Sequence, residues 1–130
     1  MQKKAIRAIS GSKYNAHTNP LYLDLNILKI DDIYNLETVK FVYKFKNKIL
    51  PTPLNHLFLP NDQVYERRTR QSNNFHVTKC RTTLATQHIK RNGPLIWNNL
   101  PTNIKLLPQI DMKQFSSHVT KFYIEQYKPI

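Results

Sequence analysis

Apolar residues recur at helical spacing along most of this chain, and glycine, proline and aspartate separate the periodic stretches. Residues 2–10 have one apolar face and one basic face, and Gly11 follows where a helix C′ glycine is expected. Residues 20–28 predict a second, short helix, because Asn19 is a good cap residue and Pro20 suits the first helical position.

The longest periodic stretch follows two aspartates. Either Asp31 or Asp32 is expected to cap a helix that ends at Pro51, since proline cannot continue a helix. The apolar positions of this stretch are Ile33, Leu36, Val39, Val42, Tyr43, Ile49 and Leu50. The pattern predicts one long amphipathic helix in the first half of the chain.

Shorter elements are predicted after that helix. Thr52-Pro53 starts a helical turn that runs to Phe58, and residues 102–107 form another turn that Pro108 stops. Asp111 is expected to cap a last amphipathic helix. The apolar positions of that helix are Phe115, Val119, Phe122, Tyr123 and Tyr127.

Residues 88–101 hold the only tryptophan and one of the two glycines of the chain. They predict a short strand, a turn and a short helix, because Gly93 can take a positive φ and Pro94 fits a first helical position. Trp97 is then expected in the core, as the largest side chain of the chain. Its expected neighbours are Leu95, Ile96 and Leu100.

Strand-like alternation is confined to a basic stretch before this turn. Phe75 and Val77 alternate with polar residues, and residues 87–90 form a second short extended run that could pair with the first. The fold class predicted from all of these patterns is mainly α. It is a small helical domain with at most a short β-hairpin around residues 75–91.

The charge of the chain indicates what kind of partner it binds. The chain has 20 Lys and Arg against 8 Asp and Glu, a formal charge of +12. Residues 14–65 sum to zero, whereas residues 66–91 carry seven cations against Glu66 alone, or +6. A field of this sign favours polyanions or an anionic membrane, and nucleic acid is the commoner such partner. No membrane partner is expected, because nucleic acid is the commoner partner and no apolar run reaches the roughly 18 residues of a membrane span.

Aromatic rings are interleaved with these cations, as single-stranded nucleic acids require for stacking. The predicted nucleic-acid-binding residues are Tyr65, Arg67, Arg68, Arg70, His76, Lys79, Arg81, Lys90 and Arg91. Their chemistry is phosphate neutralisation plus stacking. No zinc-finger, RNP or helix-turn-helix pattern indicates base-specific recognition. A solvated basic loop without a partner is the alternative interpretation.

No catalytic, metal or cofactor site is predicted. His76, Cys80 and His88 are too few for structural zinc, which usually takes four ligands. Asp31 and Asp32 resemble a polymerase magnesium pair only superficially, because they stand at a predicted helix start. The chain has two glycines and no nucleophile elbow, which leaves no phosphate loop or triad. The single cysteine fits an intracellular location.

Several stretches together, in order, resemble one family. They are residues 2–9, 14–21 and 25–34, Thr69-Arg70-Gln71-Ser72, Arg81-Thr82-Thr83, and Ile89 through Gly93-Pro94-Leu95-Ile96-Trp97-Asn98-Asn99-Leu100-Pro101, with the helix around Phe115. The likeness is to the part after the palm in reverse transcriptases of non-LTR retrotransposons (LINEs), of the jockey and CR1 type. Arg67 departs from the pattern, since family members commonly have a tyrosine there; Tyr65 could replace it.

The resemblance implies a non-catalytic C-terminal fragment of an RNA-directed DNA polymerase. Residues 1–19 would be the end of a thumb helix and a connector. Residues 20–130 would be a basic helical domain that helps to grip template RNA and target DNA, in the nucleus or in a cytoplasmic ribonucleoprotein. Two other interpretations stay open: a protein-interaction module that docks on a polymerase core through residues 2–9 and the last helix, and an inactive element remnant.

Overall fold

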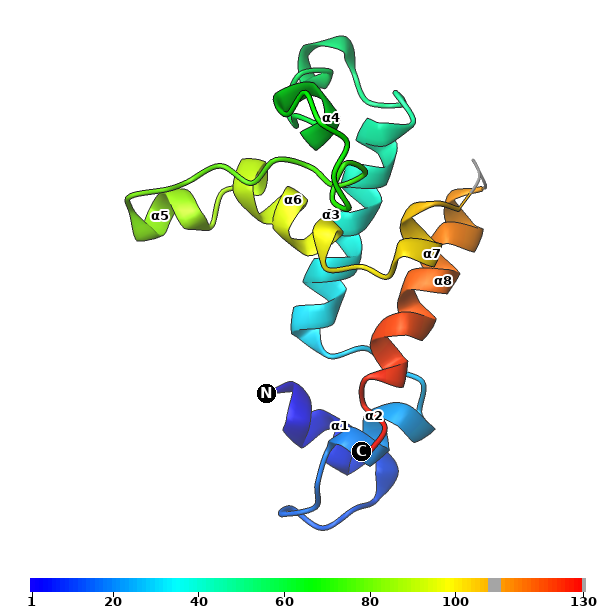
Figure 1. Ribbon diagram of the computed structural model, residues 1–130. Helices are drawn as coiled ribbons and strands as arrows, with labels where there is room; N and C mark the ends of the chain where they lie inside the picture. Colours follow the sequence, from blue (N-terminus) through cyan, green and yellow to red (C-terminus); the bar gives the residue numbers. More distant parts are fainter. Residues whose placement is uncertain (108–110, 130) are drawn as a thin grey trace. The chain divides into compact units, whose positions relative to one another are not determined.

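The computed structural model describes residues 1–107 and 111–129, and it confirms the mainly helical fold (Figure 1). In the described part the helices are α1 (Gln2–Ser10), α2 (Asn19–Asp24), α3 (Ile30–Lys46), α4 (Asn61–Val64), α5 (Thr83–Thr86), α6 (Ile89–Asn98), α7 (Thr102–Lys105) and α8 (Met112–Glu125), with a 3-10 turn η1 at Thr52–Leu54.

The chain divides into two compact units that do not follow the order of the sequence. The first unit combines Met1–Leu36 with Asp111–Ile130, and the second unit is Glu37–Ile110. The division predicted at residue 19 therefore falls inside the first unit.

The first unit is held by side chains that bind distant backbone groups. α1 packs on α2, and α2 packs on α8. Gln2 Nε2 donates to Leu28 O at 2.9 Å, and Gln2 Oε1 accepts from Ile30 N at 2.9 Å. Arg7 Nε donates to Ala16 O at 2.9 Å. The side-chain amide of Gln2 thus fixes the segment before α3, and Arg7 of α1 contributes to the stability of the first unit.

Tyr127 fixes the end of the chain to the start of α3. Its hydroxyl donates to Asp32 Oδ2 and accepts from Lys29 N at 3.0 Å. Lys29 Nζ also lies 4.5 Å from the centroid of the Tyr127 ring. Burial, followed by the hydrogen bond to Asp32, raises the pKa of Tyr127. Burial and the charge of Asp32 raise the pKa of Tyr123 to about 12.

Aromatic rings form the core of the second unit. The ring centroids of Phe45 and Phe58 are 5.0 Å apart, those of Phe58 and Phe75 are 6.0 Å apart, and those of Phe75 and Trp97 are 6.2 Å apart. Such edge-to-face and tilted pairs add to the free energy gained by burying their area. Trp97 is 1% exposed and Leu100 is 4% exposed, which confirms their predicted place in the core.

The strand and turn predicted before Trp97 are wrong. Residues from Ile89 onward are already helical, and His88 Nδ1 accepts from Lys90 N at 3.1 Å to start α6. Gly93 and Pro94 therefore lie inside the helix instead of starting it. The Gly93-Pro94 pair predicts a turn followed by a helix start, whereas the residue that caps the helix, His88, stands earlier in the chain.

Gly93 serves a close approach between helices and has no positive φ. A Cβ atom at this position would lie 2.9 Å from Phe58 Cε1 and 3.3 Å from Val42 Cγ2. α6 crosses α3 at this point (Figure 1). Leu95, which was predicted to neighbour Trp97, is instead 40% exposed on the outer face of α6.

The β-hairpin predicted around residues 75–91 does not form, in a stretch that the structure describes throughout. Phe75 makes an isolated antiparallel bridge with Pro60. Asn98 takes the place of a strand on the other side: its Oδ1 accepts from Phe75 N at 3.0 Å, and its Nδ2 donates to Phe75 O at 2.9 Å. Thr82 Oγ1 accepts from Ala85 N at 3.2 Å and starts α5. Thr82 and His88 cap α5 and α6, so the residues of the predicted second strand lie at helix ends instead.

Two predictions about the ends of α3 are also wrong. α3 ends at Lys46, before the predicted stop at Pro51, because Lys48 turns the chain with φ 59° and Ile49 N donates back to Lys44 O at 3.0 Å. Asp31 and Asp32 lie within the first turn of α3 and do not cap it.

Three other ends agree with the patterns. Gly11 closes α1 with φ 66°. Asp111 occupies the cap position of α8, but its side chain makes no capping hydrogen bond. α7 lies within the helical turn predicted for residues 102–107. The ends of α2 differ from the prediction: Thr18 and not Asn19 stands at the cap position, and the helix ends at Asp24 instead of running to residue 28. Pro108 lies outside the described residues.

Replacement of Gly93 by alanine tests the close approach. In an ordinary helix this change stabilises by about 1 kcal/mol, but here the new methyl group must displace the buried Phe58 ring, which costs about 1–3 kcal/mol. We expect Gly93→Ala to lower the free energy of unfolding in urea by about 1 kcal/mol. Adding Phe58→Leu should recover part of this loss, and purely additive effects of the two changes would contradict the contact.

Replacement of Tyr127 by phenylalanine tests the anchor at Asp32. Loss of the hydroxyl leaves a half-buried carboxylate without that donor, so stability at pH 8 should fall by about 1–3 kcal/mol. Because the pKa of Tyr127 is raised in the folded state, its contribution is complete below pH ~10 and falls as the pH rises above that value. Urea midpoints of the two proteins should therefore stay apart up to about pH 10 and approach each other only above it; a gap that does not narrow above that pH would argue against the hydrogen bond.

Candidate nucleic-acid interface

The basic loop, residues 62–73, carries three of the predicted arginines and is closed at its base by backbone hydrogen bonds. Asn61 N donates to Asn74 O at 2.9 Å, and His76 N donates to Leu59 O at 2.7 Å. These bonds flank the bridge between Pro60 and Phe75, so the aromatic core holds both ends of the loop.

The Thr69-Arg70-Gln71-Ser72 stretch shapes this loop. Thr69 Oγ1 accepts from Gln71 N at 3.4 Å, and Thr69 O accepts from Ser72 N at 3.1 Å. The buried Asn61 donates through Nδ2 to Gln71 O at 3.0 Å. The turn therefore has a structural reason of its own, and Arg70 lies exposed within it.

The structure brings together some of the predicted binding residues. Tyr65 and Arg70 line a common pocket of about 440 Å³. His76 and Lys90 line another, of about 300 Å³, together with His56. The remaining predicted residues are placed as follows: Arg67, Arg68, Lys79 and Arg81 are exposed in the chain between α4 and α5, and Arg91 is half-buried in α6.

Carboxylates do not neutralise these cations. Across residues 1–107 and 111–129, the ion pair that the structure contains joins Lys40 Nζ to Glu37 Oε1 at 2.9 Å on α3. None of the seven cations predicted as binding residues forms an ion pair within that part of the chain. No carboxylate therefore compensates their charge, and all of them except the half-buried Arg91 are exposed.

Two other lysines are used by the fold. Lys105 is buried, and its Nζ donates to Asn74 Oδ1 at 2.8 Å and to Asn98 O at 2.7 Å. Lys46 Nζ donates to Lys105 O at 2.6 Å. Burial lowers the pKa of both lysines, because it disfavours the charged form. The net charge of the chain thus overstates the charge that a ligand can meet.

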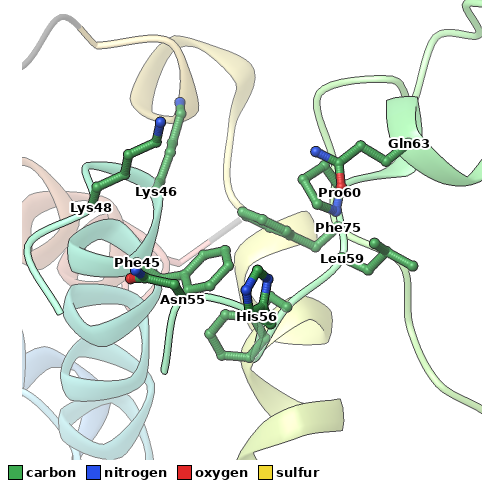
Figure 2. A pocket seen from close by; sticks show the side chains of 10 residues that line it. Phe45, Lys46, Lys48, Asn55, His56, Leu59, Pro60, Gln63 and Phe75 are labelled. Atoms are coloured by element: carbon green, nitrogen blue, oxygen red, sulfur yellow. The ribbon is translucent and has the colours of Figure 1, made fainter. Parts of the chain in front are cut away.

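A third pocket, of about 550 Å³, was missed by the sequence analysis (Figure 2). Its lining includes the rings of Phe45 and Phe75 and the polar side chains of Lys48, His56 and Gln63. Residues 14–65 have a net charge of zero, so counting charges along the chain does not point to the lysines at this pocket. The sequence does contain one sign of a basic site here, because lysines alternate with other residues between positions 44 and 48.

The histidines and the cysteine do not gather into a metal centre within the described residues, where no group of three His, Cys, Asp or Glu side chains could hold a metal ion. Cys80 Sγ donates to Ala85 O at 3.6 Å beside α5. No helix in the described ranges is both long and apolar enough for a membrane span. No family model, curated protein or solved structure matches the chain.

Limited trypsin digestion tests the exposure of the cations. Cleavage after Arg67, Arg68, Arg70, Lys79 and Arg81 should be about tenfold or more faster than cleavage within α1 or α3, because helical backbone must open before it enters a protease. Mass spectrometry of the first fragments checks this order. First cuts after Lys40 or Lys44 of α3 would contradict it.

Proposed function

We propose that this chain is the non-catalytic, nucleic-acid-binding C-terminal part of a non-LTR retrotransposon reverse transcriptase. In this role it holds template RNA or target DNA through the basic loop and the adjoining cations. The observation that supports the proposal best is the exposure of Arg67, Arg68 and Arg70 on a loop that is closed at its base and has no ion pairs among the described residues.

Free cations on an anchored loop suit phosphate binding for two physical reasons. Each cation that meets a phosphate releases counterions, which favours binding at low salt. A loop whose ends are already fixed by hydrogen bonds loses less conformational entropy on binding than a free segment does.

Tyr65 supplies a surface for stacking beside these cations. Its side chain is 54% exposed and lines the same pocket as Arg70. A base can stack on the phenol ring while the guanidinium meets the neighbouring phosphate, an arrangement that tolerates any sequence. His76 and Lys90 offer a similar pair in their own pocket.

The alternative function, docking on a polymerase core, has less support from the geometry. The apolar face of α8 is already buried within this chain at Phe115, Val119 and Tyr123. Ile9 of α1 is 68% exposed and remains for such a contact. The cations of the basic loop would have no part in that role.

Charge reversal of the basic loop tests the proposal. We expect Arg67→Glu, Arg68→Glu and Arg70→Glu together to weaken binding of single-stranded RNA by about tenfold or more near 0.1 M salt. Each phosphate contact to a single strand contributes about 0.7 to the slope of log K against log salt, so the slope should fall by about 2. Fluorescence anisotropy over a salt series measures both quantities.

The matched control is Lys3→Glu, Lys4→Glu and Lys13→Glu, three exposed positions of the first unit. Both triple variants lower the formal charge of +12 by six. If the control weakens RNA binding as much as the arginine reversal does, the effect comes from overall charge and the assigned site is wrong.

A further inference from the structure

The pocket beside the end of α3 combines an aromatic wall with a basic rim. Phe45 contributes a half-buried ring, Phe58 and Phe75 contribute rings that are 4% and 6% exposed, and Lys48 and His56 contribute nitrogen donors. Figure 2 shows Lys48 extending from the end of α3 on one side and Gln63 on the other, with His56 between them. No Asp or Glu is among the lining residues that the structure describes. Its chemistry therefore suits a ligand with a flat ring and a negative charge.

Lys48 is held at the pocket by an unusual backbone conformation. Its φ of 59° is in the left-handed region, where a helix-ending residue is usually glycine or asparagine. Lys46, on the same rim, is occupied by Lys105 O and lies 5.6 Å from the Trp97 ring centroid. Lys48 lines the pocket and has no ion pair or side-chain hydrogen bond within the described residues, so its charge is not compensated there.

The pocket adjoins residues already assigned to nucleic-acid binding. His56, Phe58 and Leu59 line both this pocket and the neighbouring one. The neighbouring pocket is lined on its other side by His76 and Lys90. A strand held at these two residues can therefore reach the aromatic wall.

We propose that this pocket binds one nucleotide, with its base against the half-buried Phe45 ring and its phosphate at Lys48 and His56. The assignment deepens the proposed function, on which it rests for the source of the nucleotide: one unstacked base of the bound strand enters the pocket. Aromatic stacking of this kind accepts any base, because every base has a π-face.

Two probes separate the contribution of the base from that of the phosphates. The first is a single strand of about twelve deoxyadenosines with one central 2-aminopurine, and the second is a strand of the same length made of abasic spacers. The unmodified protein should bind the strand with bases about tenfold more tightly than the abasic strand and should quench the 2-aminopurine fluorescence. A third probe, 2-aminopurine riboside monophosphate, reports on single-nucleotide sites, and its dependence on Lys48 separates the pocket beside the end of α3 from the pocket of Tyr65 and Arg70.

Lys48→Gly removes the cation and also relieves the left-handed conformation, so its melting temperature should not fall. It should weaken binding of the monophosphate about fivefold or more and reduce quenching in the strand. Lys44→Ala is the matched control, an exposed α3 lysine outside the pocket whose loss removes the same charge.

The outcomes separate the two proposals. If intact and abasic strands bind equally, or if Lys48→Gly behaves as Lys44→Ala does, the nucleotide pocket is overturned, while RNA binding that depends on the basic loop stands. If no strand binds but the monophosphate binds through Lys48, the pocket stands and the proposed function fails. Preference for a phosphotyrosine peptide over the monophosphate would assign the pocket to a protein partner and overturn the nucleotide.

Discussion

The second unit depends on one steric constraint, the close approach of Phe58 to the backbone of α6 at Gly93. The Phe58 ring occupies the place where any other residue at position 93 would have a side chain. From there the rings continue through Phe45 and Phe75 to Trp97. Both ends of the basic loop and one wall of the proposed nucleotide pocket rest on Phe75, so the candidate binding surfaces are built directly on this packing.

The predictable part of the fold is the part fixed by local signals. Gly11 ends α1 because a glycine takes a left-handed conformation at no steric cost, and Asp111 marks the start of α8. Apolar spacing also located Trp97 and Leu100 in the core. These features depend on residues that are close together in the chain, so the sequence is enough to predict them.

The mistaken parts depend on contacts between residues far apart in the chain. Nothing near Gly93 in sequence reveals Phe58, so a glycine needed for packing was interpreted as a glycine needed for a turn. The side chain of Asn98 satisfies the backbone of Phe75, a substitution for strand pairing that no alternation pattern can reveal.

The use of each charge also depends on contacts between distant residues. Counting showed where cations concentrate, but it could not show that Lys105 is buried or that Lys48 stands at a pocket.

The closed base of the basic loop has a consequence for how such a surface can vary. Asn61 and Asn74 are bonded to each other, and the residues between them contribute little to the core, because all are exposed except the half-buried Ser72. Closing a somewhat longer loop costs little more entropy than closing this one. The arginine-bearing tip could therefore be lengthened, shortened or rewritten to suit a different strand geometry, while the scaffold that presents it keeps its packing unchanged.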